Sequence, residues 1–366
     1  MADAPFQPDW FSKPGDTLLT LMEHRELTCD ALAKKLGRSE ATVRGLLAGS
    51  VEIDDALAQG LADCVAGTAA FWRSRQSSYS ASLARAASAI PQETSSAWLR
   101  QFPHRDILNQ GWIAKPNKPD DLLQAYLAYF GVVDPIEWAE RYAKSLKVAF
   151  RTSPSFKSKS GSLSAWLRRG ELEAASMLTA RWSPQLLRER IQEMRVLTKA
   201  KTPAYFLPRL RKIFADAGVA LVFIRAPSGC HASGATRFLT SNKAMIVLSF
   251  RYLSDDHFWF TLFHELGHLL LHGSATTFID GKDNNLTQQE REANEFSAAA
   301  LIPPARRDEL FDLKPRKENV IRFAFSVGVS AGIVVGQLQH HRVIKQNQLN
   351  FLKRRFDWEQ IAHAVS

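Results

Sequence analysis

The residues best suited to chemistry lie in one short stretch, Phe263 to His268, which reads Phe-His-Glu-Leu-Gly-His. An apolar run precedes this stretch and three leucines follow it, which is typical of a buried helix. On a helix, His264 and His268 are four residues apart and therefore lie on one face. Two imidazoles placed in this way can hold one Zn²⁺, and Glu265 can take a proton from a water at the metal. The stretch therefore predicts a zinc site.

The alternative interpretation is a helix with satisfied polar residues and no metal. It has to bury two histidines and a glutamate in an apolar setting, which is costly for polar groups without partners. Metal ligation removes that cost, so the metal site is favoured. Ser254, Asp255 and Asp256 precede the apolar run and offer a cap and negative charge for the start of the helix.

A catalytic zinc needs a third protein ligand, because it has three and keeps one position for water. Residues 286–301 are rich in alanine and glutamate and predict a second helix. Glu290 and Asn294 share a face of that helix, so one can bind the metal while the other hydrogen-bonds a ligating imidazole. Thr287 and Glu290 also fit a capping box, which uses the same carboxylate. The spacing alone does not choose between these roles.

From about Val219 to the C-terminus the chain resembles the ImmA/IrrE family of zinc metallo-endopeptidases. The likeness rests on His264-Glu-Leu-Gly-His268, Glu290-x-x-x-Asn294-x-Phe296 and Ala-Leu301-Ile-Pro303. The resemblance implies His264, His268 and Glu290 as the zinc ligands of a gluzincin-like HExxH…E site. It also implies Glu265 as the base and a small zincin-like fold. Several members of the family cleave transcriptional repressors, so we expect a regulator, an antitoxin or the chain itself as the protein substrate.

The N-terminal part predicts a helix-turn-helix. Residues 28–36 form an amphipathic pattern with Thr28 as cap, and Gly37 can end that helix in the left-handed conformation. A second helix restarts after Ser39 and would enter a major groove with its N-terminal residues at the base edges.

This part resembles the XRE-type helix-turn-helix of HigA-like antitoxins. The likeness is carried by Pro14-Gly15, Leu32-Ala33, Leu36-Gly37, residues 46–49, Phe71-Trp72, Gln76 and Tyr79. By that resemblance, the residues that face DNA are Arg38, Ser39, Glu40, Thr42 and Arg44. A glutamate at position 40 departs from the neutral or basic residue that such helices often carry, and it repels phosphate.

Charge is spread unevenly along the chain. Residues 1–89 hold 9 Lys and Arg against 11 Asp and Glu, residues 90–215 hold 21 against 11, and residues 216–366 hold 17 against 15. Counterion release supplies much of the affinity for DNA, and the helix-turn-helix is not basic overall. Either a locally basic face suffices in a homodimer, or the middle region shares the phosphate contacts, or the module binds protein instead.

The expected fold class is mainly α with a small α+β domain. We expect a helix-turn-helix domain at 1–89, a helical basic middle domain at 90–203 and a zincin-like metallopeptidase domain at 204–366. Strands are expected at 219–224, 235–239 and 244–249, as a small antiparallel sheet to whose edge an extended peptide can add. The tryptophans at 98, 112, 138, 166 and 182 are spaced as core anchors, with a ligand-binding box as the alternative.

Three further residues are candidates to stabilise an oxyanion: Arg237, Tyr252 and His272. Each has a structural alternative, which is a charge at a sheet edge, a core tyrosine and a cation at a helix C-terminus, respectively.

Composition limits the class of protein. With 366 residues, 45% hydrophobic and 23% charged, the chain has an ordinary soluble composition. It shows no signal-peptide pattern and no run of about 18 apolar residues. Its three cysteines are far apart and form no Cys-x-x-Cys, which indicates reduced thiols. We therefore expect a cytoplasmic protein without a membrane partner.

Two functions remain in competition. The first is a zinc endopeptidase coupled to a DNA-binding transcription regulator, with operator DNA and a regulatory protein or antitoxin as partners in a stress or phage-defence response. The second is a HigA-like antitoxin and autorepressor of a toxin–antitoxin pair, in which the metal site is structural or sensory. An intact Glu265 favours the first, because a purely structural site does not need it.

Overall fold

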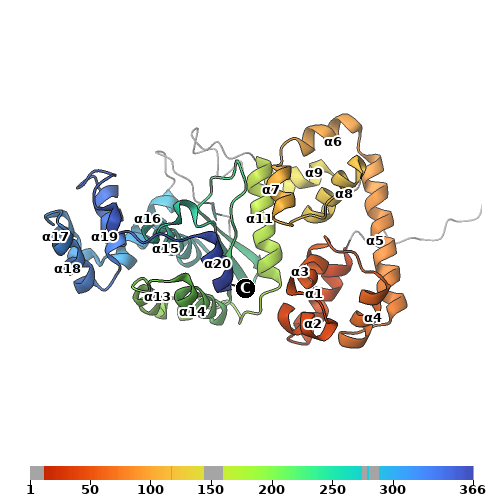
Figure 1. The fold of residues 1–366 in the computed structure, drawn as a ribbon, viewed down its shortest axis with the longest axis horizontal. Coiled ribbons are helices and arrows are strands. Elements are labelled where there is room, and N and C mark those ends of the chain that lie inside the picture. Colours follow the sequence, from red (N-terminus) through yellow and green to blue (C-terminus); the bar gives the residue numbers. More distant parts are fainter. Residues whose placement is uncertain (1–11, 117, 144–159, 274–277, 280–287, 366) are drawn as a thin grey trace, which may run out of the picture. The chain divides into compact units, whose positions relative to one another are not determined.

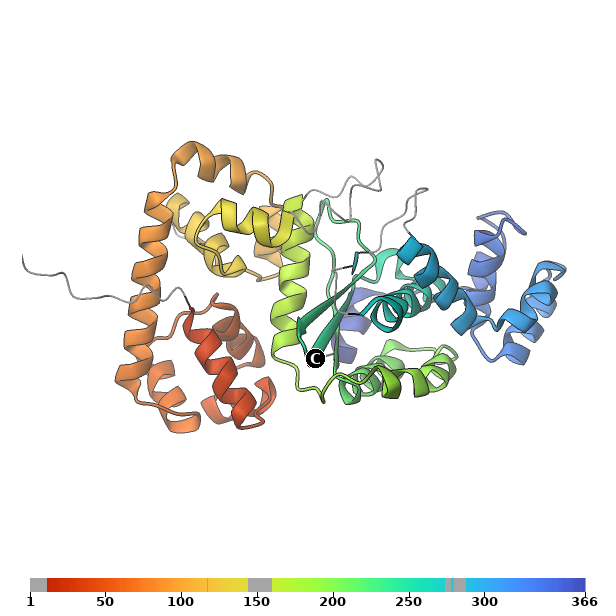
Figure 2. The ribbon, with the colours of Figure 1, turned by 180° about the vertical axis from the view of Figure 1, so that it is seen from behind.

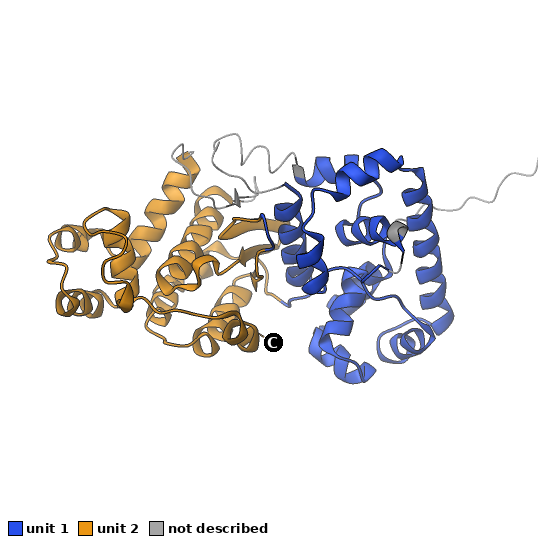
Figure 3. Cartoon of the chain, turned by 45° about the horizontal axis from the view of Figure 1, so that its top comes forward, with its two compact units in different colours: residues 1–146, 159–178, 227–229 blue, residues 147–158, 179–226, 230–366 orange. Residues whose placement is uncertain are grey.

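The computed structural model describes residues 12–116, 118–143, 160–273, 278–279 and 288–365 (Figure 1). These residues are mainly helical with one small sheet, so the expected fold class is confirmed. They form two compact units (Figure 3). Unit 1 holds the described residues up to 178 together with 227–229, and unit 2 holds the other described residues from 179 onward. The finer three-domain division stays a prediction.

Unit 1 is entirely helical. Its elements are α1 (Pro14–His24), α2 (Cys29–Leu36), α3 (Glu40–Ala48), α4 (Asp55–Cys64), α5 (Ala69–Ala89), α6 (Gln92–Leu99), α7 (His104–Asn109), α8 (Pro119–Phe130), α9 (Pro135–Trp138), the π-helical η1 (Ala139–Ala143) and α11 (Ser160–Ala175).

The two capped helices expected at the N-terminus are present as α2 and α3. The hydroxyl of Thr28 accepts the N–H of Ala31 at 3.1 Å, and the hydroxyl of Ser39 accepts the N–H of Thr42 at 3.2 Å. Gly37 ends α2 with a φ of 62°, a left-handed value that glycine adopts without steric cost. Each helix therefore begins and ends where its sequence signals indicate.

The aromatic side chains of the middle region form a core. Trp98 packs edge-on against Phe102 and Trp138, and each of the tryptophans at 98, 112, 138 and 166 is at most 3% exposed. Trp182 belongs to unit 2, where it packs against Phe238. The interpretation as core anchors therefore fits these side chains.

Unit 2 combines the sheet with helices. Its elements are α12 (Pro184–Glu189), α13 (Ile191–Leu197), α14 (Pro203–Asp216), β1 (Val219–Phe223), β2 (Gly234–Thr240), β3 (Lys243–Leu248), η2 (Arg251–Leu253), α15 (Asp255–His272), β4 (Phe278–Ile279), α16 (Gln288–Leu301), η4 (Pro304–Arg306), α17 (Arg307–Phe311), α18 (Lys317–Val327), α19 (Ala331–His340), η5 (Asn350–Leu352) and α20 (Trp358–Val365).

The sheet has the strand order β1-β3-β2-β4. The three expected strands are present as β1, β2 and β3, but the sheet is mixed and not wholly antiparallel. β3 lies between β1 and β2. It runs parallel to β1 and antiparallel to β2. The short β4 pairs antiparallel with β2. The expectation of an antiparallel sheet was wrong for β1 because strand order depends on contacts that no local pattern records.

One face of this sheet packs against helices. Side chains alternate between faces along a strand, and Leu221 of β1 and Ile246 of β3 are paired and both belong to the core that α14 and α15 complete. Thr236 of β2 is paired with Ile246 and therefore lies on that same face, toward α15. The register of β2 thus decides which of its side chains reach α15.

The C-terminal elements hold the beginning of α15. The hydroxyl of Ser330, which caps α19, also bonds to the carboxylate of Asp255 at 2.8 Å, and the backbone N–H of Arg354 donates to Asp255 at 3.0 Å. Lys353 forms an ion pair with Asp256 at 2.6 Å. Burial raises the pKa of Asp255 to about 6, although the Ser330 and Arg354 hydrogen bonds oppose the rise. These bonds connect the first turn of α15 to the C-terminal part of the chain.

Among the described residues, no single helix has the length and apolar composition needed to cross a membrane. The pair α18 and α19 meets that requirement only when both are counted together, across a bend of 108°.

Candidate metal centre and helix-turn-helix

Helix α15 positions the histidines in the interior of unit 2. It is apolar along most of its length, and His264 and His268 are each at most 1% exposed. The expected cap is only partly realised. Ser254 is the residue before the helix, but its hydroxyl bonds to the carboxylate of Asp256 at 2.7 Å instead of a backbone N–H. Buried side-chain bonds therefore replace the expected cap.

Helix α16 lies alongside α15 (Figures 1 and 2). The two backbones approach closely at Gly267, where an added Cβ would lie 3.2 Å from the Cα of Ala293 and from a ring carbon of Phe296. The hydroxyl of Ser297 donates to the carbonyl of Phe260 at 2.9 Å and also joins the helices. This close packing brings Glu290, in the first turn of α16, to the histidine face of α15.

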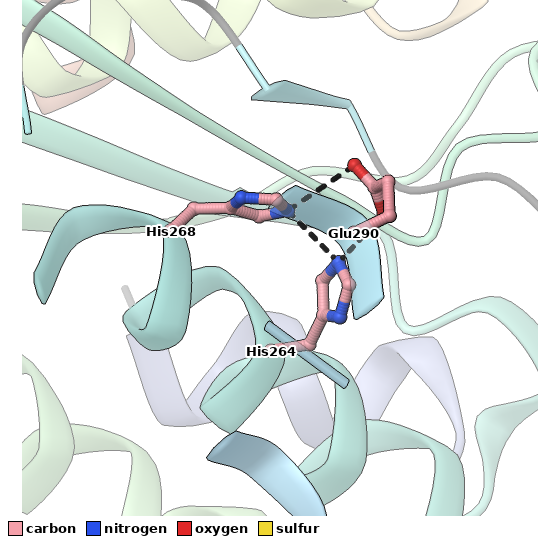
Figure 4. A group of neighbouring side chains, drawn as sticks. All are labelled: His264, His268 and Glu290. Atoms are coloured by element: carbon pink, nitrogen blue, oxygen red, sulfur yellow. Dashed lines mark hydrogen bonds and ion pairs between the residues drawn. The ribbon is translucent and has the colours of Figure 1, made fainter. Parts of the chain in front are cut away.

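Three ligand-type atoms converge there (Figure 4). The Nε2 atoms of His264 and His268 are 3.0 Å apart, and the two carboxylate oxygens of Glu290 lie 3.3 Å from them, Oε2 from His264 and Oε1 from His268. A tetrahedral zinc with bonds of about 2.0–2.2 Å separates its ligand atoms by about 3.3–3.6 Å. The separations between these side-chain atoms are therefore close to those that a tetrahedral zinc needs.

The ionisation of these groups also suits a metal. Burial lowers the pKa of His268 to about 4, against the opposing effect of Glu290. Burial raises the pKa of Glu290, but its hydrogen bonds with His264 and His268 outweigh this and bring it to about 2. Near neutral pH the site thus offers an imidazole lone pair and a negative carboxylate, which are the forms that bind a cation.

Asn294 lies behind the first histidine, one of the two roles that its shared face with Glu290 allows. Its side-chain oxygen is 3.0 Å from Nδ1 of His264. An oxygen at this position accepts a hydrogen bond from the Nδ1–H group and leaves the Nε2 lone pair directed at the site. Thr287, the alternative capping partner of Glu290, lies outside the described residues. In the described part of α16, the Glu290 carboxylate contacts the histidines.

Glu265 is completely buried, and its carboxylate is hydrogen-bonded to a residue of the sheet. The hydroxyl of Thr236 donates to its carboxylate at 2.6 Å. A Cβ added to Gly234 would lie 2.5 Å from the other carboxylate oxygen, so only glycine permits this approach of β2. Sequence reasoning missed both residues. No local signal marks either residue, because the contact of each with Glu265 depends on the register of β2.

The structure gives the three oxyanion candidates other contacts. Arg237 follows Thr236 on β2 and therefore lies on the opposite face of the sheet, away from α15. Tyr252 precedes α15 with a φ of 72°, and its ring lies 4.4 Å from that of His257. His272 places Nδ1 3.2 Å from Nδ1 of His268, on the side of that ring opposite Nε2.

The DNA-facing candidates of α3 also have internal partners. Arg38 and Ser39 are exposed, while the hydroxyls of Ser39 and Thr42 are 2.9 Å apart at the cap. Arg44 forms ion pairs with Glu40 at 2.7 Å and with Glu173 of α11 at 2.5 Å. Glu173 also pairs with Arg169. The cationic residue of α3 is thus engaged by carboxylates of its own unit.

Residues 218–338 match Peptidase_M78, the IrrE N-terminal-like domain. The match contains α15, the four strands of the sheet and α16, so it supports the ImmA/IrrE resemblance for this part of the chain and indicates a metallopeptidase-type function. The helix-turn-helix lies outside the matched residues. A search of characterised proteins gives no match to the chain.

Proposed function

We propose that the chain is a zinc-dependent endopeptidase that acts on a regulatory protein or an antitoxin. The observation that carries the proposal is the convergence of His264, His268 and Glu290, whose side-chain contacts are 3.0–3.3 Å long. Two imidazoles and a carboxylate are a donor set that catalytic zinc uses in gluzincin-like sites. The IrrE N-terminal-like match over the same residues supports a peptidase.

In the proposed reaction, different residues transfer the proton and position the reacting groups. Zinc, when bound, supplies Lewis acidity that polarises the scissile carbonyl. Glu265 accepts a proton from the attacking water on its carboxylate and later gives that proton to the leaving amine. Thr236 holds the carboxylate in place through its hydrogen bond of 2.6 Å, and Asn294 fixes the ring of His264. The close approach of β2 at Gly234 leaves no room for a side chain beside the carboxylate of Glu265.

The test separates metal binding from the reaction. Glu265→Gln keeps nearly the same size and leaves the three ligands intact, so it should retain zinc and lose proteolysis by about 10²–10⁴-fold. His264→Ala/His268→Ala should lose both. Zinc is measured by elemental analysis, and cleavage by comparing the proteomes of cells that express each variant.

Two results would contradict the proposal. Zinc retained in the double histidine variant would remove the metal assignment. Wild-type cleavage and phenotype in zinc-loaded Glu265→Gln would favour the alternative, an antitoxin and autorepressor with a structural or sensory metal.

We further propose that α2 and α3 bind operator DNA, and that Arg44 exchanges Glu173 for a DNA phosphate when they do. The proposal is supported by the capped helices and the exposed Arg38 at the turn. Two carboxylates oppose DNA binding: Glu173 competes with phosphate for the guanidinium of Arg44, and Glu40 and Glu173 both repel DNA.

Matched substitutions test this second proposal in the full chain. Arg44→Ala should weaken binding to the DNA upstream of the gene. Glu173→Gln should tighten it by about two- to fivefold, the range of a part-exposed ion pair, while Glu93→Gln on the exposed face of α6 is the control. Affinity is measured by fluorescence anisotropy at several salt concentrations, because phosphate contacts give a steep salt dependence. Wild-type affinity in both Arg44→Ala and Glu173→Gln would show that α3 is not the reader.

A further inference from the structure

The second histidine of the centre has an unusual partner. Nδ1 of His268 lies 3.2 Å from Nδ1 of His272, one helical turn further along α15. Nε2 of His272 lies 2.9 Å from a carboxylate oxygen of Glu292 on α16. The His272 side chain is only 5% exposed. Three side chains thus form a continuous chain that leads from His268 to the surface carboxylate of Glu292.

The positions of the protons in this chain follow from counting donors and acceptors. A neutral imidazole carries one proton on one nitrogen and a lone pair on the other. If Nε2 of His268 binds a metal, its proton is on Nδ1 and must be donated to Nδ1 of His272. His272 then carries its own proton on Nε2, where Glu292 accepts it. Each contact has one donor and one acceptor, with both histidines neutral.

Helix α16 therefore supports both nitrogens of the His268 ring, one directly and the other through His272. Glu290 and Glu292 are two residues apart, so their side chains leave α16 in different directions. Glu290 places an oxygen 3.3 Å from Nε2 of His268, and Glu292 reaches Nδ1 of the same ring through His272. His264, in contrast, is fixed behind its ring by the amide of Asn294. The two histidines thus have chemically different supports.

We propose that His272 and Glu292 are positioning residues for the metal ligand His268. They fix its tautomer and ring orientation, and the carboxylate charge makes its Nε2 a stronger donor. This inference rests on the proposed metal site. It also gives His272 a role other than oxyanion stabilisation, because both of its ring nitrogens are engaged in the chain.

The test measures metal affinity and not only activity. His272→Phe keeps a ring but removes both nitrogens, so zinc affinity should fall about 10–100-fold, the usual effect of losing such a partner. His272→Gln restores an acceptor for Nδ1 of His268 and should recover most of that loss. Glu292→Leu should lower affinity about tenfold, and Glu295→Gln, on an exposed position of α16, is the matched control. Zinc affinity is measured by competition with a chromophoric chelator.

A second readout excludes a merely structural effect. The visible absorption of the Co²⁺-substituted protein should change in His272→Phe and return toward wild type in His272→Gln. Wild-type zinc affinity and cobalt spectrum in His272→Phe, or in Glu292→Leu if the first variant does not fold, would overturn the inference. Retention of zinc by His264→Ala/His268→Ala would instead overturn the metal site itself, so the two failures are distinguishable.

Discussion

At the scale of single residues, different partners give two neighbouring buried carboxylates of α15 different pKa values. Asp256 is paired with Lys353 at 2.6 Å, which with His257 and Ser254 lowers its pKa against the effect of burial. Asp255 accepts only hydrogen bonds from neutral donors at Ser330 and the Arg354 and Asp256 backbones, and burial raises its pKa to about 6. The proton of Asp255 is therefore bound more tightly in the folded state.

We predict that Asp255 makes the protein less stable as pH rises from about 4 to above 6. In that window the folded state binds more protons than the unfolded state, so stability is present at low pH and is lost as pH rises through the folded pKa. The total loss is roughly 3 kcal/mol for a shift of about two units. Asp255→Asn should remove this dependence.

The measurement is the difference in urea midpoint between wild type and Asp255→Asn from pH 4.5 to 7.5. Taking the difference cancels the titration of the metal ligands, which is common to both proteins. The difference should move in favour of the variant as pH rises. A constant difference would show that Asp255 is ionised throughout.

At the scale of elements, what the sequence could predict depends on how local each interaction is. His264, His268 and Glu265 are within one turn or so of a single helix, so spacing alone predicted their arrangement. The same argument on α16 predicted that Glu290 and Asn294 share a face. Thr236 and Gly234 could not be predicted, because they reach Glu265 only through the order and register of the strands.

The packing of α15 on α16 gives an element-scale prediction at Gly267. Gly267→Val should force the helices apart, because even a Cβ would lie 3.2 Å from the Ala293 backbone. We expect a loss of about 1–3 kcal/mol in stability from overpacking and at least a tenfold loss of zinc affinity as Glu290 moves away. Urea unfolding and chelator competition measure the two quantities.

Ser297→Ala is the matched control for Gly267→Val. It removes the hydrogen bond to Phe260 without adding volume, so stability should fall by about 1 kcal/mol while zinc affinity stays near wild type. An equal loss of zinc affinity in both variants would show that general stability, and not helix spacing, controls the site.

At the scale of the whole molecule, the two units have separate cores, and the metal-site candidates all lie in unit 2. We therefore predict two unfolding transitions in calorimetry, of which chelation shifts one. Zinc at 1,000 times its dissociation constant stabilises the folded state by about 4 kcal/mol, which corresponds to a shift on the order of 10 °C for a unit of this size.

His264→Ala/His268→Ala identifies the transition of unit 2, because in this variant EDTA should move neither transition. A single transition in wild type, shifted as a whole by chelation, would contradict the prediction and would show that the two units unfold as one.

In the proposed DNA-binding role, the ion pair between Arg44 and Glu173 sets a free-energy cost that every DNA site using Arg44 has to meet. Because Glu173 belongs to the same unit, it competes for the guanidinium at a fixed effective concentration, whatever the amount of protein. A DNA site that uses Arg44 must exceed this threshold before it gains the contact. An internal carboxylate of this kind would lower the affinity for every such site by the same factor of about two to five. Random sequence, held with dissociation constants of about 10⁻⁴–10⁻⁶ M, would therefore be occupied less.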